Sequence, residues 1–172
     1  MTTQPIILAA VDLDRRAAAV IEQAARLAAL CQARLAVAHV VDDAAGYEAD
    51  HTFPQRPGDL RESMTRYARA WLVGMINHLD LPNGWVEVLV ETGPVTATLA
   101  ALVVELQPRY CLMGPARLGP LSPSAGLAAA IGGRSRCELM TIQAKPGGEG
   151  VGLGRWLRQW ITGHAGVTGR HA

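Results

Sequence analysis

Apolar residues occur in two different patterns along the first 145 residues of the chain. Ile6–Val11 is a continuous aliphatic run, typical of a strand covered on both faces, and Ala17–Leu30 then repeats apolar residues at helical spacing. The same two patterns predict further strands at Arg34–Val41, Trp85–Glu91, Arg109–Met113 and Glu138–Gln143, and further helices at Asp59–Leu79, Gly93–Leu106 and Ser124–Ser135. Residues 42–58 mix charges, two prolines and two glycines without periodicity, and predict a long loop.

The alternation of strands and helices places the chain in the α/β class. It predicts a doubly wound three-layer sandwich around a five-stranded, mostly parallel sheet with right-handed crossovers, in the common order 3-2-1-4-5. Such sheets bind ligands beyond the carboxyl ends of their strands, where the strand order reverses, so we expect Asp12, Val40 and Gly114 to face one crevice. Two of these residues also have a purely structural explanation, Val40 in the core and Asp12 as the cap of the next helix.

Four short segments resemble the universal stress protein family. They are Ile7–Asp12 before an alanine-rich helix, His39–Asp42 at the end of the second strand, Glu91–Pro94 and Leu112–Gly114. The segments follow the family's order, and the resemblance covers about residues 5–144. It implies the same α/β fold, and it implies one of two kinds of protein, since some members of the family bind nucleotide and others do not.

The loop after Arg109–Met113 departs from the pattern of the nucleotide-binding members. That pattern is Gly, two residues, Gly, nine residues, then Gly-Ser or Gly-Thr. Here Gly114 supplies the first glycine, but the next two glycine positions hold Arg117 and Leu127. Aligning the final strand instead places Ala125 and Gly126 at the last pair, in a shorter loop. Three prolines also remove backbone N–H donors from the loop: Pro115, Pro120 and Pro123.

The resemblance therefore implies half of a nucleotide site. Asp12 and Val40 stand where binders of the family contact adenosine, whereas the phosphate cradle is degraded. We expect no tightly bound cofactor. Weak binding of ATP or AMP is the alternative, and Arg117, Ser122 and Ser124 with nearby amides form a second possible anion site. The simpler explanation of these residues is a solvated, proline-stiffened loop.

No arrangement of residues typical of an enzyme is found. Asp12 and Asp14 resemble the acidic cluster of a receiver domain, but the third strand ends in Glu91-Thr92 and Lys145 follows only the last strand. The serines lack a G-x-S-x-G elbow, and the five histidines lack the spacing of a metal site. His39 is expected to be a buried, hydrogen-bonded strand residue. We predict neither catalysis nor a metal.

Length, charge and cysteine usage limit the remaining classes. The 172 residues suit one domain, residues 1–145, followed by a tail. A formal charge of +1 gives no reason to expect nucleic-acid binding. The odd set Cys31, Cys111 and Cys137 suits reduced core thiols, and the start of the chain lacks a basic segment before its apolar run. We therefore expect a cytoplasmic protein.

The last predicted strand lies at an edge of the sheet. It contains Leu139, Met140, Thr141, Ile142 and Gln143, with no proline or lysine inside it to discourage pairing with another chain. The resemblance points the same way, because members of the family commonly dimerise through their last strand. We predict a symmetric homodimer with this edge at or near the interface.

The tail, residues 146–172, begins as a glycine-rich hinge and continues into a short amphipathic helix. Leu153, Trp156, Leu157 and Trp160 share one predicted helical face, and arginines lie on the other faces. A helix this short needs a surface to pack on. The domain itself or its dimer partner is the favoured surface, another protein comes second, and an anionic membrane is the least favoured.

These observations predict a non-catalytic, universal-stress-like regulatory protein. It would act as a cytoplasmic homodimer through protein contacts and would keep only a degraded nucleotide-binding loop. The alternative function is an ATP-binding switch or slow ATPase that uses an irregular phosphate loop.

Overall fold

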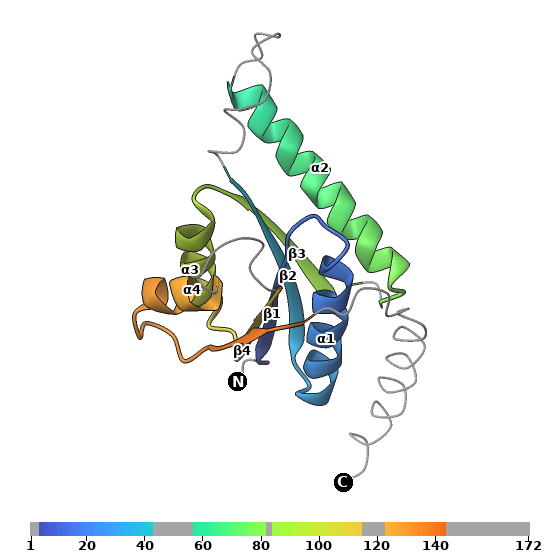
Figure 1. Ribbon diagram of the computed structural model, residues 1–172. Helices are drawn as coiled ribbons and strands as arrows, with labels where there is room; N and C mark the ends of the chain where they lie inside the picture. Colours follow the sequence, from blue (N-terminus) through green and yellow to red (C-terminus); the bar gives the residue numbers. More distant parts are fainter. Residues whose placement is uncertain (1–3, 43–56, 82–83, 115–122, 144–172) are drawn as a thin grey trace, which may run out of the picture.

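The computed structural model of the chain describes residues 4–42, 57–81, 84–114 and 123–143. Within these ranges the chain forms a five-stranded sheet in the order β3-β2-β1-β4-β5, and every neighbouring pair of strands is parallel. Helices lie on both sides of this sheet, so the protein is a three-layer α/β sandwich (Figure 1). The predicted fold and strand order are confirmed.

The elements follow the predicted alternation. The strands are β1 (Ile6–Ala10), β2 (Arg34–Val41), β3 (Val86–Thr92), β4 (Tyr110–Met113) and β5 (Glu138–Thr141). The helices are α1 (Ala17–Leu30), α2 (Pro57–His78), α3 (Val95–Leu106) and α4 (Pro123–Ile131). β1 is the central strand and is buried along nearly its whole length, which explains its continuous apolar sequence.

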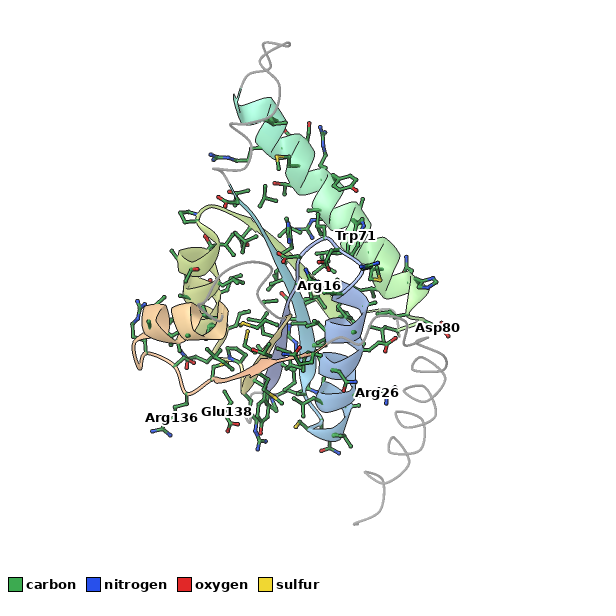
Figure 2. The ribbon with its side chains drawn as sticks, viewed as in Figure 1. Arg16, Arg26, Trp71, Asp80, Arg136 and Glu138 are labelled. Atoms are coloured by element: carbon green, nitrogen blue, oxygen red, sulfur yellow. The ribbon has the colours of Figure 1, made fainter. Side chains whose placement is uncertain are left out.

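Each face of the sheet has its own core. α1 and α2 cover one face, and α3 and α4 cover the other (Figures 1 and 2). The core under α1 and α2 includes Ile7, Ile21, Leu35, Leu72 and Leu112. The core under α3 and α4 includes Leu8, Ala36, Val103, Cys111 and Leu127. Adjacent strand residues such as Ile7 and Leu8 enter opposite cores, because side chains alternate across a sheet.

α2 is the longest helix, with 22 residues, and it packs on β2 and β3. Its buried side is formed by Ala68, Leu72 and Ile76, whereas Tyr67 and Val73 are exposed. This division is the expected pattern for a helix with one face on a core. None of the helices in the described ranges combines the length and the apolar content needed to cross a bilayer.

Several predicted boundaries are wrong by a few residues, among them the start of α2 at Pro57, inside the loop predicted at 42–58, and the differences at α4 and β5 have a visible cause. The helix predicted at Ser124–Ser135 begins at Pro123 and ends at Ile131, because Gly132 and Gly133 take left-handed φ values of +56° and +76° that end it. β5 ends at Thr141, so Ile142 and Gln143 follow the strand instead of belonging to it. The Ile142 backbone N–H still donates to the Met113 carbonyl at 2.8 Å, which keeps this segment on the sheet.

The cysteines are packing residues. None forms a disulfide, Cys111 is buried, and Cys31 and Cys137 are half-buried. Burial, and secondarily the charge of Cys137, raises the pKa of the Cys111 thiol to about 12. Burial, with a smaller effect of Glu138, raises the pKa of Cys137 to about 11. Both thiols stay protonated at neutral pH and are therefore poor nucleophiles.

Candidate functional site

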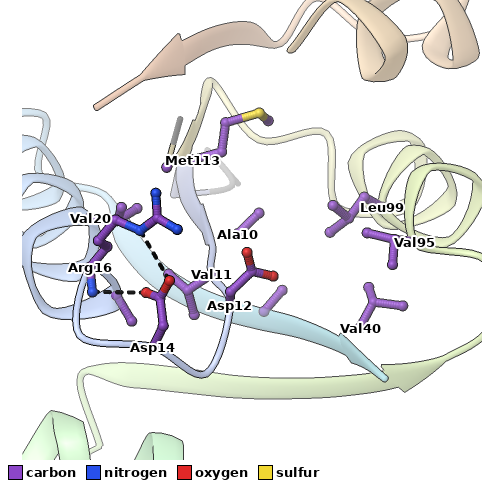
Figure 3. A pocket seen from close by; sticks show the side chains of 13 residues that line it. Ala10, Val11, Asp12, Asp14, Arg16, Val20, Val40, Val95, Leu99 and Met113 are labelled. Atoms are coloured by element: carbon purple, nitrogen blue, oxygen red, sulfur yellow. Dashed lines mark hydrogen bonds and ion pairs between the residues drawn. The ribbon is translucent and has the colours of Figure 1, made fainter. Parts of the chain in front are cut away.

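A cavity of about 250 Å³ opens at the carboxyl ends of the central strands. It lies where the strand order reverses, between β1 and its two neighbours β2 and β4. Figure 3 shows the cavity between the start of α1 on one side and the start of α3 on the other. Its described lining consists of Ala10, Val11, Asp12, Asp14, Arg16, Ala17, Val20, Ala38, Val40, Val95, Leu99, Met113 and Gly114.

The cavity brings together the three residues expected to face one crevice. Asp12 follows β1, Val40 lies near the end of β2, and Gly114 follows β4. They meet because all strands are parallel, so that their carboxyl ends share one edge of the sheet. In Figure 3 the Asp12 side chain stands in the middle of the opening, between the β1–α1 turn and Val40.

The β1–α1 turn is held by Asp14. One carboxylate oxygen of Asp14 accepts from the Arg16 backbone N–H at 2.8 Å, and the other lies 3.1 Å from Arg16 Nε. The N-cap residue of α1 is Arg16, so the alternative in which Asp12 caps this helix is wrong. The turn instead places Asp12 at the rim of the cavity with its side chain exposed.

The charges of the described lining do not favour a phosphate. The charged members are Asp12, Asp14 and Arg16, which leaves one net negative charge. Arg16 is already engaged by Asp14, both through the ion pair and through the backbone hydrogen bond. The one cation of the described lining is therefore already paired with a carboxylate and is poorly placed to bind a phosphate.

The remaining lining is apolar and comes from both sides of the switch point. Met113, Val40 and Ala38 form the floor on the sheet, and Val95 and Leu99 form a wall on α3. A volume of about 250 Å³ lies just below the range of about 300–1,000 Å³ typical of small-molecule sites. The described part of the cavity can thus accept a small, largely apolar group, and has few charged partners.

Sequence reasoning missed Val95 and Leu99 as lining residues. Their i, i+4 spacing in a helix predicts only core packing. The neighbouring residues do not indicate that the first turn of this helix extends beyond the edge of the sheet. The signal that was available is the Gly93-Pro94 start of α3, because a helix that begins directly after a strand places its first turn at the carboxyl edge.

Gly93 fixes where that helix begins. Its φ is +137°, and a Cβ added at this position would stand 2.9 Å from Thr98 Oγ1. Its backbone N–H also donates to the Val41 carbonyl at 3.0 Å, which ties the turn to the end of β2. Glycine is therefore required here, and Pro94 takes the N-cap position with α3 starting at Val95.

His39 supports the floor of the site from the opposite face of β2. Its Nδ1 lies 2.8 Å from the Val11 carbonyl, and the Val11 N–H donates to the Ala38 carbonyl at 2.9 Å. The hydrogen bond expected of His39 is confirmed, although the ring is half-buried and not fully buried. Together the two bonds join the end of β1 to β2 directly beneath the rim.

The other predicted phosphate-site residues lie apart from the described lining or outside the described residues. Gly126 belongs to α4, and a Cβ there would lie 4.0 Å from Thr96 Cγ2 on α3. Ser124 is the second residue of α4. Arg117 and Ser122 fall in residues 115–122, outside the described ranges, so their placement stays a prediction.

The predicted interface residues follow the edge of the sheet. β5 pairs with β4 alone among the described strands. Met140 and Thr141 are exposed, Leu139 and Ile142 are half-buried, and Gln143 is exposed just after the strand. The predicted tail residues Leu153, Trp156, Leu157 and Trp160 lie outside the described residues.

The sequence profile of the universal stress protein family matches residues 5–141. Similar solved structures include a universal stress protein from Burkholderia pseudomallei, with 23% identity over 81% of this chain and 96% of the other, at a TM-score of 0.58. Another is UspA from Lactobacillus plantarum, with 18% identity over 82% and 99% and a TM-score of 0.59.

A third similar structure is a universal stress protein in complex with cAMP, with 17% identity over 84% of this chain and 100% of the other, at a TM-score of 0.52. These likenesses show a shared fold. A comparison with curated protein sequences gave no match.

Proposed function

Because the chain belongs to the universal stress protein family, we propose that it is a non-catalytic regulatory protein that acts as a homodimer through protein contacts, with a degraded nucleotide site. The proposal includes a cytoplasmic location, which suits three cysteines without a disulfide.

The observation that carries the proposal is the charge of the cavity lining. Two carboxylates and one paired arginine line its described rim, whereas a triphosphate needs several free donors and positive charge. The sequence of the adjoining loop supports the same conclusion, since Arg117 replaces a glycine and three prolines remove N–H groups. Signalling by this chain would therefore depend on its surfaces.

The experiment is a thermal-shift titration with ATP and Mg²⁺, with adenosine and tripolyphosphate in parallel. A ligand at one hundred times its Kd adds about 2.7 kcal/mol of stability. For a chain of this size that corresponds to a rise in Tm of about 5–10 °C. We expect a shift below about 2 °C at 1 mM ATP, the value for a Kd of 1 mM or weaker. A shift of 5 °C or more would refute the degraded site.

Homodimerisation through β5 is supported by the hydrogen-bonding pattern of the strand. The backbone N–H of Glu138 donates at 3.1 Å to the carbonyl of Arg109, directly before β4, and that of Ile142 donates at 2.8 Å to the carbonyl of Met113, the last residue of β4. Because successive N–H groups of a strand point to opposite sides, those of Leu139 and Thr141 point away from β4, toward the open edge. This row of donors is available to a second copy of the strand.

The dimer proposal has a direct test at Thr141. Thr141→Pro removes one outward N–H and leaves the bonds to β4 intact, so the fold is retained while edge pairing is blocked. Thr141→Val is the matched control, since it keeps the N–H. Sedimentation equilibrium is expected to give a dimer for the wild type and Thr141→Val, and a weakened dimer or monomer for Thr141→Pro. A dimer of unchanged affinity in Thr141→Pro would contradict pairing through this edge.

A second candidate function, an ATP-binding switch or slow ATPase, is favoured by one observation, the meeting of Asp12, Val40 and Gly114 at one cavity. The similar universal stress protein in complex with cAMP makes a nucleotide a reasonable ligand to test. Gly114→Ala separates this candidate from the first. Among the described residues the added Cβ meets Val20 Cγ2 alone, at 4.0 Å, so stability should hold while a ligand that approaches the Gly114 backbone is excluded. Gly74→Ala on α2 is the control, because it lies away from the cavity lining.

A further inference from the structure

One half of the α1/α2 face of the sheet has no helix of its own among the described elements. α1 connects β1 to β2 and α2 connects β2 to β3, so with right-handed crossovers both helices cover the β1–β2–β3 half. α3 and α4, which lead to β4 and β5, lie on the other face (Figure 1). β4 and β5 therefore present their α1-side residues next to the flank of a single helix.

The side chains on this half are apolar and incompletely covered. Met140 stands in register with Leu112 and Ala9, which belong to the core under α1, so it points to the α1 side and is 39% exposed. Tyr110 and Ile142 also pack on that core and are only half-buried. Water therefore reaches a row of three large apolar side chains along β4 and β5.

The neighbouring flank of α1 continues this apolar row. Val20 lies on that flank, because its Cγ2 would stand 4.0 Å from a Cβ at Gly114, the residue after β4. Leu27 follows two helical turns later on the same side and is half-buried. Leu30 lies beyond it and is 66% exposed. We call Leu27, Leu30, Tyr110, Met140 and Ile142 together the α1–β5 strip.

We propose that the α1–β5 strip is the docking site of this chain's own segment 153–161, which covers it as a fifth helix beside α1. The segment carries Leu153, Trp156, Leu157 and Trp160 at i, i+3, i+4 and i+7, a single apolar face. Two tryptophans bury about 300–500 Å² when covered. The strip offers the large apolar surface that such a face requires, and this inference is independent of the nucleotide site.

The position and length of the connection favour the chain's own segment over an external partner. Ile142 packs on the α1-side core one residue before the described chain ends, so the last described residues lie beside the strip. Nine residues, 144–152, separate Gln143 from Leu153 and can span up to about 30 Å. A nine-residue helix is only about 14 Å long, shorter than α1. A connection of nine residues rich in glycine corresponds to an effective concentration of the segment in the millimolar range.

The end of the strip near the start of β5 carries one charge of each sign, because the Arg109 guanidinium lies 5.4 Å from the centre of the Tyr110 ring and Glu138 pairs in register with Tyr110. Glu138 lies on the exposed part of β5 in register with Tyr110, at the end of the strip near the start of the strand (Figure 2). The segment brings Arg155 and Arg158 and has no acidic residue. A helix that runs back from the end of β5, alongside α1, carries these arginines toward that carboxylate.

The test is limited proteolysis of the full chain with trypsin, followed by mass spectrometry. Arg155 and Arg158 are cleavage sites inside the segment, and Arg170, beyond it, reports the unprotected rate in the same molecule. We expect Arg155 and Arg158 to be cut about tenfold or more slowly than Arg170, since cleavage follows the population of the open form. Equal rates at the three sites would overturn the proposal.

Substitutions in the strip and in the segment locate the docking site. Leu30→Glu with Met140→Glu should raise cleavage at Arg155 and Arg158 about tenfold, because a charge is poorly tolerated under the helix. Tyr67→Glu with Val73→Glu on α2 is the matched control, since these residues are 65% and 43% exposed and lie on a different helix. Trp156→Ala with Trp160→Ala should have the effect of the strip variant without altering the domain.

Two results would refute the assignment. If the tryptophan variant loses protection while Leu30→Glu with Met140→Glu keeps it, the segment docks elsewhere. If protection in the wild type declines on dilution, the segment sits on a second copy of the chain. Circular dichroism melts of all variants establish that the domain is folded under the conditions of digestion.

Discussion

Replacing Gly93 with alanine tests whether the turn between β3 and α3 requires glycine. The residue has φ +137°, a region that costs an L-residue about 1–3 kcal/mol. The new Cβ would also stand 2.9 Å from Thr98 Oγ1, and turning Thr98 off its rotamer costs about 0.5–1.5 kcal/mol. Alanine also lowers the conformational entropy of the unfolded chain, and this offsets about 0.4–1 kcal/mol of the loss in stability. We expect a net loss of about 2 kcal/mol in the free energy of unfolding.

Urea denaturation followed by circular dichroism measures this loss, together with a fall in Tm of about 4–8 °C. Gly74→Ala is the control, because it lies inside α2 with no heavy atom within 4 Å of the added Cβ. It should stabilise the protein by about 0.5–1 kcal/mol. The two substitutions are chemically identical, so the opposite signs isolate the conformation of the turn.

A double-mutant cycle with Thr98→Ala separates the two contributions to the loss of stability, the positive φ and the close contact with Thr98 Oγ1. In that background the contact with Oγ1 is gone, and Gly93→Ala should cost about 1 kcal/mol less than in the wild type. If Gly93→Ala changes stability by less than about 0.5 kcal/mol in the wild type, the argument from φ and from close approach is refuted. The consequence for the site is direct, because this turn sets where Val95 and Leu99 enter the cavity.

Three further predictions concern the core, the β1–β2 connection and the surface. Burial raises the pKa of Cys111 from 9.0 to about 12, so its contribution to stability is complete below pH 9 and is lost as the pH rises to about 12. Urea denaturation should show a loss on the order of 1 kcal/mol from this thiol at pH 10. His39→Ala removes the partner of the Val11 carbonyl and should lower the free energy of unfolding by about 1–3 kcal/mol, with faster hydrogen exchange at the end of β1. The exposed pair Arg34–Glu87, at 2.6 Å, should contribute less than about 1 kcal/mol in a double-mutant cycle.

Each of these has a control. Cys111→Ala removes the thiol, so the loss of stability from pH 7 to pH 10 should be smaller in this variant than in the wild type, by on the order of 1 kcal/mol. Parallel profiles would contradict the role assigned to burial. His39→Gln keeps a side-chain donor and should recover part of the loss seen in His39→Ala. A coupling between Arg34 and Glu87 that is large and insensitive to salt would contradict a solvated surface pair.

The sequence predicted the sheet because its information is local and repeated. The apolar run of β1 and the helical spacing of α1 each specify one element, and right-handed crossovers then restrict how the elements assemble. The boundaries were less accurate at α4 and at β5. The left-handed glycines after Ile131 stop a helix whose small residues would continue it, and β5 is short because its partner β4 has only four residues.

Asp12, Val40 and Gly114 could be assigned to one edge from topology alone, since parallel strands carry their carboxyl ends to the same side of a sheet. The arrangement of charges at that edge could not be predicted from the sequence and is known only from the structure. Asp12 and Asp14 both follow β1 within four residues, yet they take different positions: Asp14 pairs with Arg16 in the turn, and Asp12 lies at the rim of the cavity. The path of the backbone through the turn determines which carboxylate pairs with the arginine. The pattern of apolar and polar residues does not predict that path.

By itself the sequence determined the class of elements, their order, the central buried strand and the loss of glycines after β4, because these depend on short-range preferences and on the count of backbone donors. Tertiary structure alone decided that Val95 and Leu99 wall the cavity, that Arg16 is paired with Asp14 there and that the β4–β5 half of one face carries an apolar strip beyond the reach of the described helices. Such properties arise from residues far apart in the chain meeting in space, and burial and charge neutralisation exist only after they meet.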